Sequence, residues 1–430
     1  MIDRYVYPEM GRIWAEENEF RIMLDIELIA CEALAELGEV PKAAVAAIRE
    51  KARLDWKRIQ EVQKNVRHDV MAFLTVIAEQ VGEEAKYIHL GLTASDVKET
   101  ALGVRMKQTA DIILTDLRHL RDVLRRRAQE HKYTAMMGRT HGMHAEPLTL
   151  GLKLAVWLDE TERHIARMEK VRETVSVGKA AGAVGTYANI SPHVEAYVCK
   201  KLGLSAAKVA TQIVQRDRHA EFLNVLAVIA SSLEKFAIEI RNLQRTDIGE
   251  VEEFFTADSQ SASIMPHRRQ PLISENVAGL ARVVRGYALA GMENVALWHE
   301  RDMTHVSVER LILPESAILT NYCLRQFAVV LEKLVIYPNV MRSNMDKTGG
   351  MIFSQRVMNA LIERGVLRDD AYQWVQRHAM AKWQEDVDFK AGILRDCNIM
   401  KHLTAEEVDF CFDYGYFLRH IDRIMARFGL

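Results

Sequence analysis

The chain contains few of the features that mark secreted or membrane-spanning proteins. Its five cysteines are an odd number, and no two of them have the spacing of metal ligands. No uncharged run approaches the roughly 18 residues that a bilayer-spanning helix needs. The first residues are charged and carry no apolar secretory segment. We therefore expect a cytoplasmic protein with free thiols and no membrane partner.

The sequence also lacks an excess of charge of either sign. Its 57 Lys and Arg residues and 59 Asp and Glu residues give a formal net charge of −2. This balance produces no overall field that would attract nucleic acid, so no nucleic-acid partner is expected. The 430 residues are 49% hydrophobic, which is enough for a large core, and they exceed the usual size of one domain.

Proline is scarce and unevenly spread. None of the eight prolines lies between residues 41 and 147 or between residues 192 and 266. Because proline breaks helix interiors, these gaps permit long helices. Five segments have apolar residues at helical spacing, namely residues 112–124, 152–171, 223–243, 277–297 and 318–336. No run of alternating strands stands out, so the sequence predicts an all-α fold with a central bundle of long helices, a length that suits packing against other subunits.

Two changes of pattern divide the chain into three expected domains. Residues 1–111 form an N-terminal helical domain, and residues 112–364 form a central domain of long helices that includes a loop at residues 258–271. Beyond residue 364 the helical pattern continues in shorter segments. This change indicates a C-terminal helical domain of residues 365–430.

Histidine and arginine gather in most of the polar clusters of the chain. The clusters lie at residues 67–69, 89–96, 138–144, 212–219 and 299–310. Histidine titrates near neutral pH, and arginine binds carboxylate or phosphate through two parallel hydrogen bonds. Such a mixture is typical of acid–base chemistry on an anionic substrate. Structural ion-pair networks use the same residue types, so spacing alone favours neither interpretation.

Neither a cofactor nor a metal is predicted. The glycines at residues 178–185 follow no predicted strand, so a tight turn between helices is favoured over a dinucleotide-binding loop. His299 and Glu300 resemble the start of a zinc-binding motif, but Met303 stands where the second histidine would be.

Motifs along the whole chain match one known pattern. They include Met137-Gly-Arg-Thr-His-Gly142, Ala145-Glu-Pro147, Gln215-Arg-Asp-Arg-His219, Ser274-Glu-Asn276 and Trp298-His-Glu-Arg-Asp302. In these motifs the chain resembles the adenylosuccinate lyase family of the fumarase/aspartase superfamily. The resemblance implies an all-helical, three-domain subunit in a homotetramer whose active sites combine residues of three subunits. It also implies β-elimination of fumarate from a small anionic N-succinyl nucleotide of purine biosynthesis, without a cofactor.

The resemblance assigns catalytic roles to particular residues. In such an elimination a base removes a proton beside a carboxylate, and an acid protonates the leaving nitrogen. His141 corresponds to the acid, His68 to its partner near the substrate, and Glu275 to the carboxylate that orients the acidic histidine. Positioned cations must receive the charge that builds up on the carboxylate.

The resemblance also implies a larger set of positions that bind substrate. They are Arg4, Tyr5, Arg67, Asp69, His89, Thr93, Ala94, Thr140, Gln212, Met265, Gln270, Asn276, Arg301, Val306 and Arg310.

The loop departs from the family pattern at the residues that should react. Aligned on the Met-Pro pair at residues 265–266, Ala262 stands in place of the serine base and Arg268 in place of a lysine. Arginine keeps the positive charge of lysine but differs in reach and geometry. Gln270 replaces an asparagine. Ser261 and Ser263 flank Ala262, and Ser263 is predicted to serve as the base instead.

Three interpretations follow from these departures. The first is an adenylosuccinate lyase-type C–N lyase. The second is a paralogue acting on a different N-succinyl compound, because Ala94 and Val306 replace hydroxyl-bearing residues that would face the ligand. The third is a catalytically silent family member, because the alanine side chain at position 262 cannot act as a base. We rank them in this order, since His68 and His141 are retained.

Overall fold

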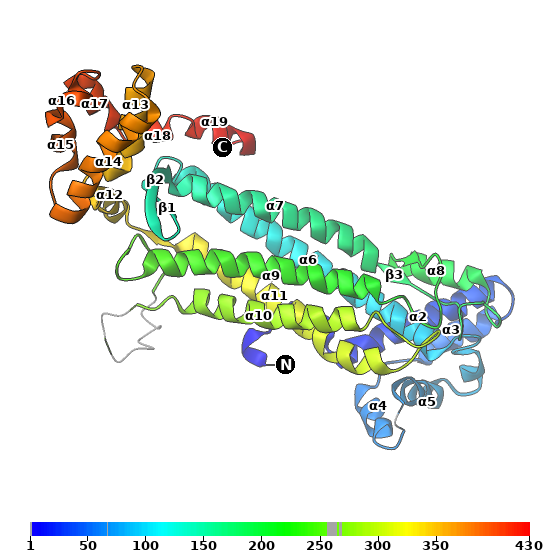
Figure 1. Ribbon diagram of the computed structural model, residues 1–430. Helices are drawn as coiled ribbons and strands as arrows, with labels where there is room; N and C mark the ends of the chain where they lie inside the picture. Colours follow the sequence, from blue (N-terminus) through cyan, green and yellow to red (C-terminus); the bar gives the residue numbers. More distant parts are fainter. Residues whose placement is uncertain (1, 67, 256–264, 266–268) are drawn as a thin grey trace. The chain divides into compact units, whose positions relative to one another are not determined.

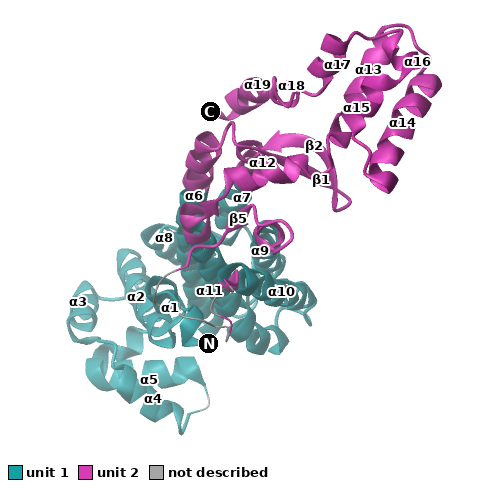
Figure 2. Ribbon diagram, turned by 90° about the vertical axis from the view of Figure 1, so that its left-hand side faces the viewer, with its two compact units in different colours: residues 1–120, 161–237, 273–328 teal, residues 121–160, 238–272, 329–430 magenta. Residues whose placement is uncertain are grey.

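The computed structural model describes residues 2–66, 68–255, 265 and 269–430. Helices dominate this part of the chain, and its strands are short (Figure 1), so the expected all-α fold is confirmed. Two compact units, coloured separately in Figure 2, comprise residues 1–120, 161–237 and 273–328, and residues 121–160, 238–272 and 329–430. The division into three domains near residues 111 and 365 stays a prediction.

The long helices form where the proline-free segments with apolar periodicity lie. They are α6 (Ala94–Glu130), α7 (Leu150–Val175), α9 (Asp217–Gln244), α10 (Leu272–Glu293) and α11 (Thr304–Lys333). Each contains most of one predicted segment, so the prediction of five long helices is confirmed. The longest, α6, has 37 residues. At 1.5 Å per residue it extends over about 55 Å.

Helix α11 begins earlier than predicted and contains a proline. It begins at Thr304, well before the predicted start at residue 318, and Pro314 lies inside it. Proline has no N–H and cannot donate to the carbonyl oxygen of Arg310, four residues earlier. Asp302 caps the start of the helix, because its carboxylate accepts a 2.8 Å hydrogen bond from the Thr304 N–H. Apolar residues that flank the proline are buried, and their packing keeps the helix continuous.

Side-chain contacts join the long helices within the first unit. A 2.5 Å hydrogen bond between Asn321 and Asp116 joins α11 to α6. A 2.8 Å hydrogen bond between His164 and Ser232 joins α7 to α9. A 2.6 Å ion pair between Arg285 and Glu234 joins α10 to α9.

Shorter helices of the first unit enclose another hydrophobic core. They are α1 (Pro8–Trp14), α2 (Glu16–Glu36), α3 (Lys42–Lys51), α4 (Trp56–Gln63), α5 (Asp69–Val81) and α8 (Pro192–Leu202). Phe20 of α2, Phe73 of α5 and Val97 of α6 belong to this core and are buried. Their packing brings the start of α6 close to α2 and α5, and this arrangement creates the cavity described below.

The second unit contains a β-hairpin that the sequence did not predict. β1 (Ala135–Thr140) pairs antiparallel with β2 (Met143–Thr149). In the two-residue turn, His141 and Gly142 have φ angles of 54° and 75°. Positive φ at both positions is the pattern of a type I′ hairpin turn. Three consecutive residues of β1, 136–138, are buried, so the strand lacks the alternation by which strands are usually recognised.

Short elements complete the two units. In the second unit β5 (Val251–Glu252) pairs with β6 (Val335–Ile336), and in the first β3 (Val177–Gly178) pairs with β4 (Ser205–Ala206). The remaining helices of the second unit are α12 (Pro338–Asp346), α13 (Ser354–Glu363), α14 (Arg368–Glu385), α15 (Phe389–Arg395), α16 (Cys397–Met400), α17 (Ala405–Cys411), α18 (Gly415–Leu418) and α19 (Ile421–Met425).

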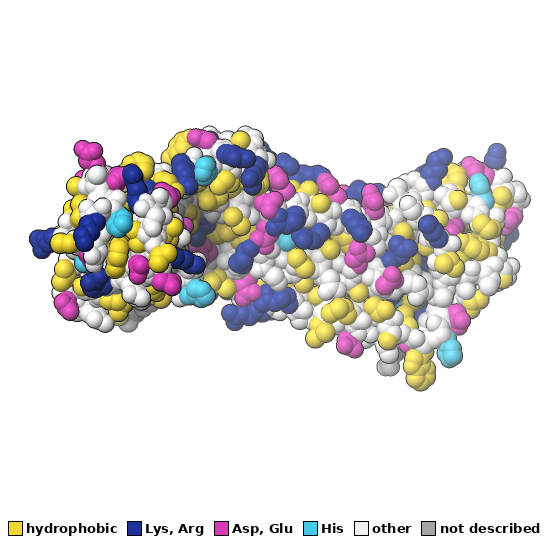
Figure 3. All heavy atoms as spheres, turned by 45° about the horizontal axis from the view of Figure 1, so that its top comes forward, with side chains coloured by type: hydrophobic (Ala, Val, Ile, Leu, Met, Phe, Trp, Pro, Cys, Tyr) yellow, Lys and Arg dark blue, Asp and Glu magenta, His cyan; other side chains and the backbone are white. Residues whose placement is uncertain are grey.

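The surface agrees with the balanced composition. Figure 3 shows basic and acidic side chains interspersed among hydrophobic ones over the face in view. Among the described residues, no helix combines the length and hydropathy that crossing a bilayer requires.

Candidate active site

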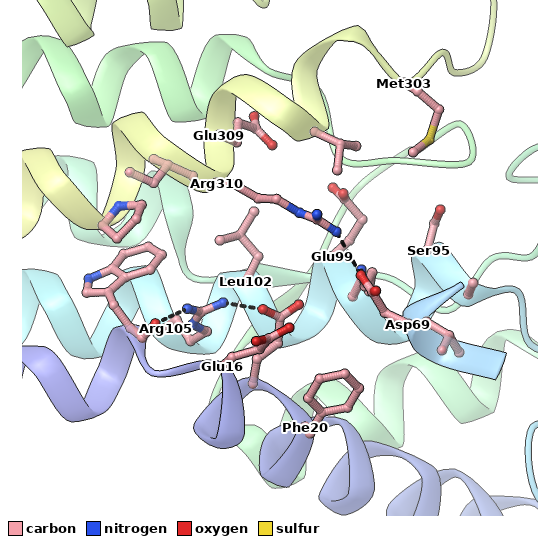
Figure 4. A pocket seen from close by; sticks show the side chains of 18 of the residues that line it. Glu16, Phe20, Asp69, Ser95, Glu99, Leu102, Arg105, Met303, Glu309 and Arg310 are labelled. Atoms are coloured by element: carbon pink, nitrogen blue, oxygen red, sulfur yellow. Dashed lines mark hydrogen bonds and ion pairs between the residues drawn. The ribbon is translucent and has the colours of Figure 1, made fainter. Parts of the chain in front are cut away.

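The first unit contains a cavity of about 790 Å³ whose walls carry charges of both signs (Figure 4). Helices α2, α6 and α11 supply most of its lining, and the start of α5 adds to it. Six of the residues predicted for the site line this cavity: His68, Asp69, Ala94, Arg301, Val306 and Arg310.

The helical repeat explains how α6 and α11 present their side chains to the cavity. Residues 95, 98, 99, 102 and 105 of α6 line it, as do residues 306, 309, 310 and 313 of α11. Spacings of three and four residues place side chains on one face of a helix. One face of each helix therefore borders the cavity, and both faces mix charged with apolar side chains.

Asp69, the first residue of α5, joins three helices at the cavity. One of its carboxylate oxygens accepts from Lys98 of α6 at 2.7 Å and from Arg310 of α11 at 2.8 Å. Figure 4 shows Arg310 reaching from α11 toward Asp69. Burial raises the pKa of Asp69, but the hydrogen bond from Lys98 and the charges of Lys98 and Arg310 outweigh it, so the pKa is lowered. The carboxylate is therefore ionised and holds both cations in place.

His68 caps α5 in a way that defines its tautomer. Its Nδ1 accepts a 3.3 Å hydrogen bond from the Met71 N–H. A neutral imidazole that accepts at one ring nitrogen carries its proton on the other. The Nε2–H of His68 is thus a donor, and His68 lines the cavity with an exposed side chain.

Arg216 connects α6 to α11 through buried ion pairs. Its guanidinium donates to Glu99 at 2.5 and 2.8 Å and to Glu309 at 3.1 Å. His219 of α9 contacts Glu309 at 2.9 Å. Burial raises the pKa of Glu309, but the hydrogen bond and charge of His219 and the charge of Arg216 outweigh it and lower the pKa to about 2. The network fixes the distance between α6 and α11, two of the helices that line the cavity.

His305 lies in the same buried region and is neutral. Its side chain is almost fully buried, and its Nδ1 has no partner within the part of the chain that the structure describes. Burial lowers the pKa of His305, and the charges of Arg216 and Arg301 lower it further against the opposing effect of Glu309. Those two guanidiniums, rather than His305, therefore carry the positive charge there.

Arg301 is the guanidinium of the cavity that is best placed to bind an anion. It donates to the amide oxygen of Gln212 at 2.9 Å and contacts the sulfur of Met303 at 3.2 Å. Neither partner carries a charge, and among the described residues no carboxylate pairs with Arg301. Its buried Nε also has no partner there. A charged donor left unsatisfied beside a cavity is suited to a carboxylate or phosphate oxygen.

His89 and Thr93 lie in the first unit but do not line this cavity. The His89 N–H and Nδ1 contact Glu27 at 2.9 and 2.6 Å, and the φ angle of His89 is 63°. Burial lowers the pKa of His89, but the hydrogen bond and charge of Glu27 outweigh it and raise the pKa. The Thr93 N–H donates to Asp96 at 2.9 Å.

Five further predicted residues of the first unit lie outside the cavity lining, among them Gln212, whose amide oxygen accepts from Arg301. Arg4 is exposed and stacks on the ring of Tyr5 at 5.9 Å, and Tyr5 packs against Tyr322. Glu275 and Asn276 are exposed in the first turn of α10.

The remaining predicted residues belong to the second unit or to the loop. Thr140 and His141 are exposed at the end of the β-hairpin. Met265 is exposed, and Gln270 is partly buried just before α10. Arg67, Ala262, Ser263 and Arg268 lie outside the described residues.

Several charged residues of the cavity were not predicted. Lys98, Glu99 and Arg105 project from one face of α6, and Arg105 pairs with Glu19 of α2 at 2.7 Å. Their three- and four-residue spacing was a signal that this face of α6 is polar. Sequence alone could not pair them with residues of α2 or α11.

We expect the acid sensitivity of the protein to depend on Glu309. A carboxyl with a depressed pKa contributes stability above its unfolded-state pKa, and this contribution is lost as the pH falls through the folded-state pKa. A fall from 4.5 to about 2 corresponds to about 3 kcal/mol. The Tm of the unaltered chain should thus fall between about pH 5 and pH 2, and Glu309→Gln should be less stable at pH 7 with a flatter acid profile. Parallel profiles for the two proteins would contradict this role.

Two family models match the chain. The model described as "Lyase" matches residues 4–286, and the one described as "Adenylosuccinate lyase C-terminus" matches residues 350–428. Two curated relatives match over the full length of both chains. They are the adenylosuccinate lyases of Bacillus subtilis (strain 168), 51% identical over 430 residues, and of Synechocystis sp., 49% identical over 431 residues.

Solved structures share the fold. A fumarate lyase from Mesorhizobium sp. BNC1 has a TM-score of 0.89 at 26% identity and 98% coverage of both chains. A 3-carboxy-cis,cis-muconate lactonizing enzyme from Pseudomonas putida has a TM-score of 0.89 at 30% identity, with 99% of this chain and 97% of the other covered. The names of these two proteins describe different reactions, so the fold they share does not by itself define a substrate.

Proposed function

The chain belongs to the adenylosuccinate lyase family of the fumarase/aspartase superfamily, and from this membership we infer that it is a carbon–nitrogen lyase that eliminates fumarate from an adenylosuccinate-type nucleotide in purine biosynthesis. About half of all residues are identical to those of curated adenylosuccinate lyases over the full length. This extent of identity disfavours both a different N-succinyl substrate and a catalytically silent role.

The observation at the site that best supports this function is the unpaired charge of Arg301. An N-succinyl nucleotide carries two carboxylates and a phosphate, so its binding site needs cations that protein carboxylates do not already neutralise. Arg301 has only neutral partners among the residues described. Arg310 pairs with Asp69, but the Arg310 side chain is largely exposed. Together they give one cavity two guanidiniums for anionic groups of the substrate.

The proposed reaction moves one proton off the substrate and returns one to it. A base removes the proton beside a succinyl carboxylate, and we assign this role to Ser263 because Ala262 has no acceptor. The electron pair of the broken C–H bond forms the C=C bond of fumarate, and the C–N bond breaks. His141 protonates the leaving nitrogen. Arg301 stabilises negative charge that builds on the carboxylate, and the Nε2–H of His68 donates to the substrate.

We further propose a cytoplasmic homotetramer with shared active sites. Exposed apolar side chains on the long helices, such as Val228 of α9 and Val283 and Leu289 of α10, support packing against other subunits. The free cysteines support a reducing compartment.

The direct test of the function is fumarate release from adenylosuccinate, followed by ultraviolet absorbance. We expect turnover by the unaltered chain and a loss in kcat/KM of roughly 10- to 100-fold for Arg301→Gln, since a charge-assisted hydrogen bond is typically worth 1.5–3 kcal/mol. Arg282→Gln is the matched control, because Arg282 is exposed and pairs with Glu234 away from the cavity. No fumarate from any variant, or equal effects of the two substitutions, would overturn the proposal.

A further inference from the structure

Glu250 is a fully buried carboxylate that contacts the hairpin carrying His141. It lies in the second unit just before β5, and its exposed fraction is 0%. Its backbone is held on both sides, because its N–H donates to the Leu243 carbonyl at 2.9 Å and its carbonyl accepts from the Tyr337 N–H at 3.0 Å. The backbone position from which the Glu250 carboxylate projects is therefore fixed.

This carboxylate binds Arg139 of β1 in a bidentate manner. The two terminal nitrogens of Arg139 donate to the two oxygens of Glu250 at 2.6 and 3.1 Å. Asn344 of α12 donates to the same carboxylate at 2.8 Å and to the Ile248 carbonyl at 2.9 Å. A planar, two-point contact fixes the direction of the guanidinium as well as its distance.

Arg139 is the last anchored side chain before the tip of the hairpin. The pairing of β1 with β2 is irregular between Met137 and Arg139. Gly138 lies in this irregularity, where an added Cβ would come within 2.4 Å of the Glu146 carbonyl oxygen. Beyond Arg139 the hairpin has one further pair, Thr140 with Met143, and the exposed turn at His141.

The base of the hairpin does not need this ion pair to stay attached. Met137 packs in a separate buried cluster with Met345 of α12 and with Phe353. Burying an ion pair is costly, and apolar residues of similar size often stabilise a fold as well or better. The Glu250–Arg139 pair is therefore better explained as fixing the direction of the hairpin than as attaching the hairpin to the rest of the unit.

We infer that Glu250 is a positioning residue, which acts through Arg139 to set the direction in which the hairpin presents His141. The inference rests on the proposed role of His141 as the general acid. A proton donor must be held close to its productive geometry, and a displacement of 1 Å can cost about 100-fold in rate. The catalytic residue is His141; Glu250 contacts neither substrate nor the reacting atoms in this assignment.

The test is Glu250→Gln, which keeps the size of the side chain and an acceptor for Asn344 but removes the charge. We expect kcat for adenylosuccinate to fall roughly 10- to 100-fold with little change in KM, because His141 would be misdirected while substrate binding in the first unit is untouched. Glu239→Gln is the matched control, since it breaks the 2.6 Å pair with Lys153 in the same unit. A folded Glu250→Gln with normal kcat would overturn the inference.

A double-variant cycle separates positioning from general loss of structure. If Glu250 acts through Arg139, the kcat of Arg139→Gln combined with Glu250→Gln should equal that of either single variant. Additive losses would contradict the proposed route. If Glu250→Gln does not fold, Arg139→Lys serves in its place, because lysine keeps the charge and loses the two-point geometry. Unchanged kcat in Arg139→Lys would then refute the inference.

A readout that needs no turnover distinguishes this inference from the proposed function. Amide hydrogen exchange at residues 139–143 should be faster in Glu250→Gln than in the unaltered chain, whereas exchange in Glu239→Gln should be unchanged. A chain that releases no fumarate would refute the proposed function alone. Unchanged exchange at the hairpin tip would refute the positioning role alone.

Discussion

Replacing Ala262 by serine is expected to raise kcat for adenylosuccinate by up to the roughly 10²–10⁴-fold that a general base usually contributes, because Ser263, the base assigned to the unaltered chain, stands one residue away from the position of the family's serine. In the family pattern the serine at this position removes the substrate proton, and alanine has no atom that can accept it. The comparison is steady-state fumarate release by the unaltered chain and by Ala262→Ser. Ala257→Ser is the matched control, because it makes the same change earlier in the sequence, outside the family motif, and should leave kcat unaltered.

An equal rate would mean that Ser263 is as effective a base as the family's serine. If the unaltered chain turns over as fast as Ala262→Ser, the hydroxyl of Ser263 alone accounts for the base, and Ser263→Ala should abolish turnover of the unaltered chain. If Ala262→Ser is active but slow, adding Arg268→Lys and Gln270→Asn should increase kcat further, since arginine and lysine differ in reach and geometry. A fully reverted loop that releases no fumarate would contradict the adenylosuccinate assignment.

Substitution of His141 by glutamine is expected to lower kcat by roughly 10²–10⁴-fold with a small change in Tm. The side chain is exposed at a hairpin turn, so its removal costs little packing, and glutamine can donate a hydrogen bond but cannot deliver a proton at neutral pH. His68→Ala, which removes the Nε2–H donor, is expected to lower kcat by roughly 10- to 100-fold. His119→Gln is the control, because His119 lies outside the polar clusters at residues 67–69 and 138–144.

Mixing the His141→Gln and His68→Ala proteins tests whether active sites combine subunits. If one subunit supplies His141 and another supplies His68, a mixed tetramer contains some sites with both histidines, and part of the activity should return after the mixture has exchanged subunits. Homotetramers of either variant contain no such site. Exchange demonstrated by mass but without recovered fumarate release would place both histidines of a site on one subunit.

Long helices were predictable because their signal is local. Within α9, buried Leu223, Leu226 and Leu233 recur at helical spacing, and no proline interrupts them. The hairpin was not predictable in the same way, because β1 buries consecutive residues. Pro314 misled the prediction of where α11 starts. Proline disfavours a helix interior, but buried apolar neighbours keep the helix continuous there, and the sequence does not show this packing.

The candidate site was predictable where a motif is contiguous and not where it depends on distant pairs. His68 and Asp69 were identified from neighbours in the sequence. The partners of Asp69 are Lys98 and Arg310, the latter 241 positions away. Glu99 was missed for the same reason, since its partner Arg216 lies 117 positions along the chain. Such pairs become visible only when the helices are placed side by side.

The left-handed backbone at His89 and His141 has an evolutionary consequence. For a residue with a Cβ this conformation costs roughly 1–2 kcal/mol, and glycine adopts it without that penalty. A laboratory population selected only for heat resistance should accumulate glycine at position 141, whereas His89 should stay, because its contact with buried Glu27 offsets the backbone cost. A population selected for purine synthesis should retain histidine. The residue found at the turn of the β-hairpin therefore records which selection a lineage has experienced.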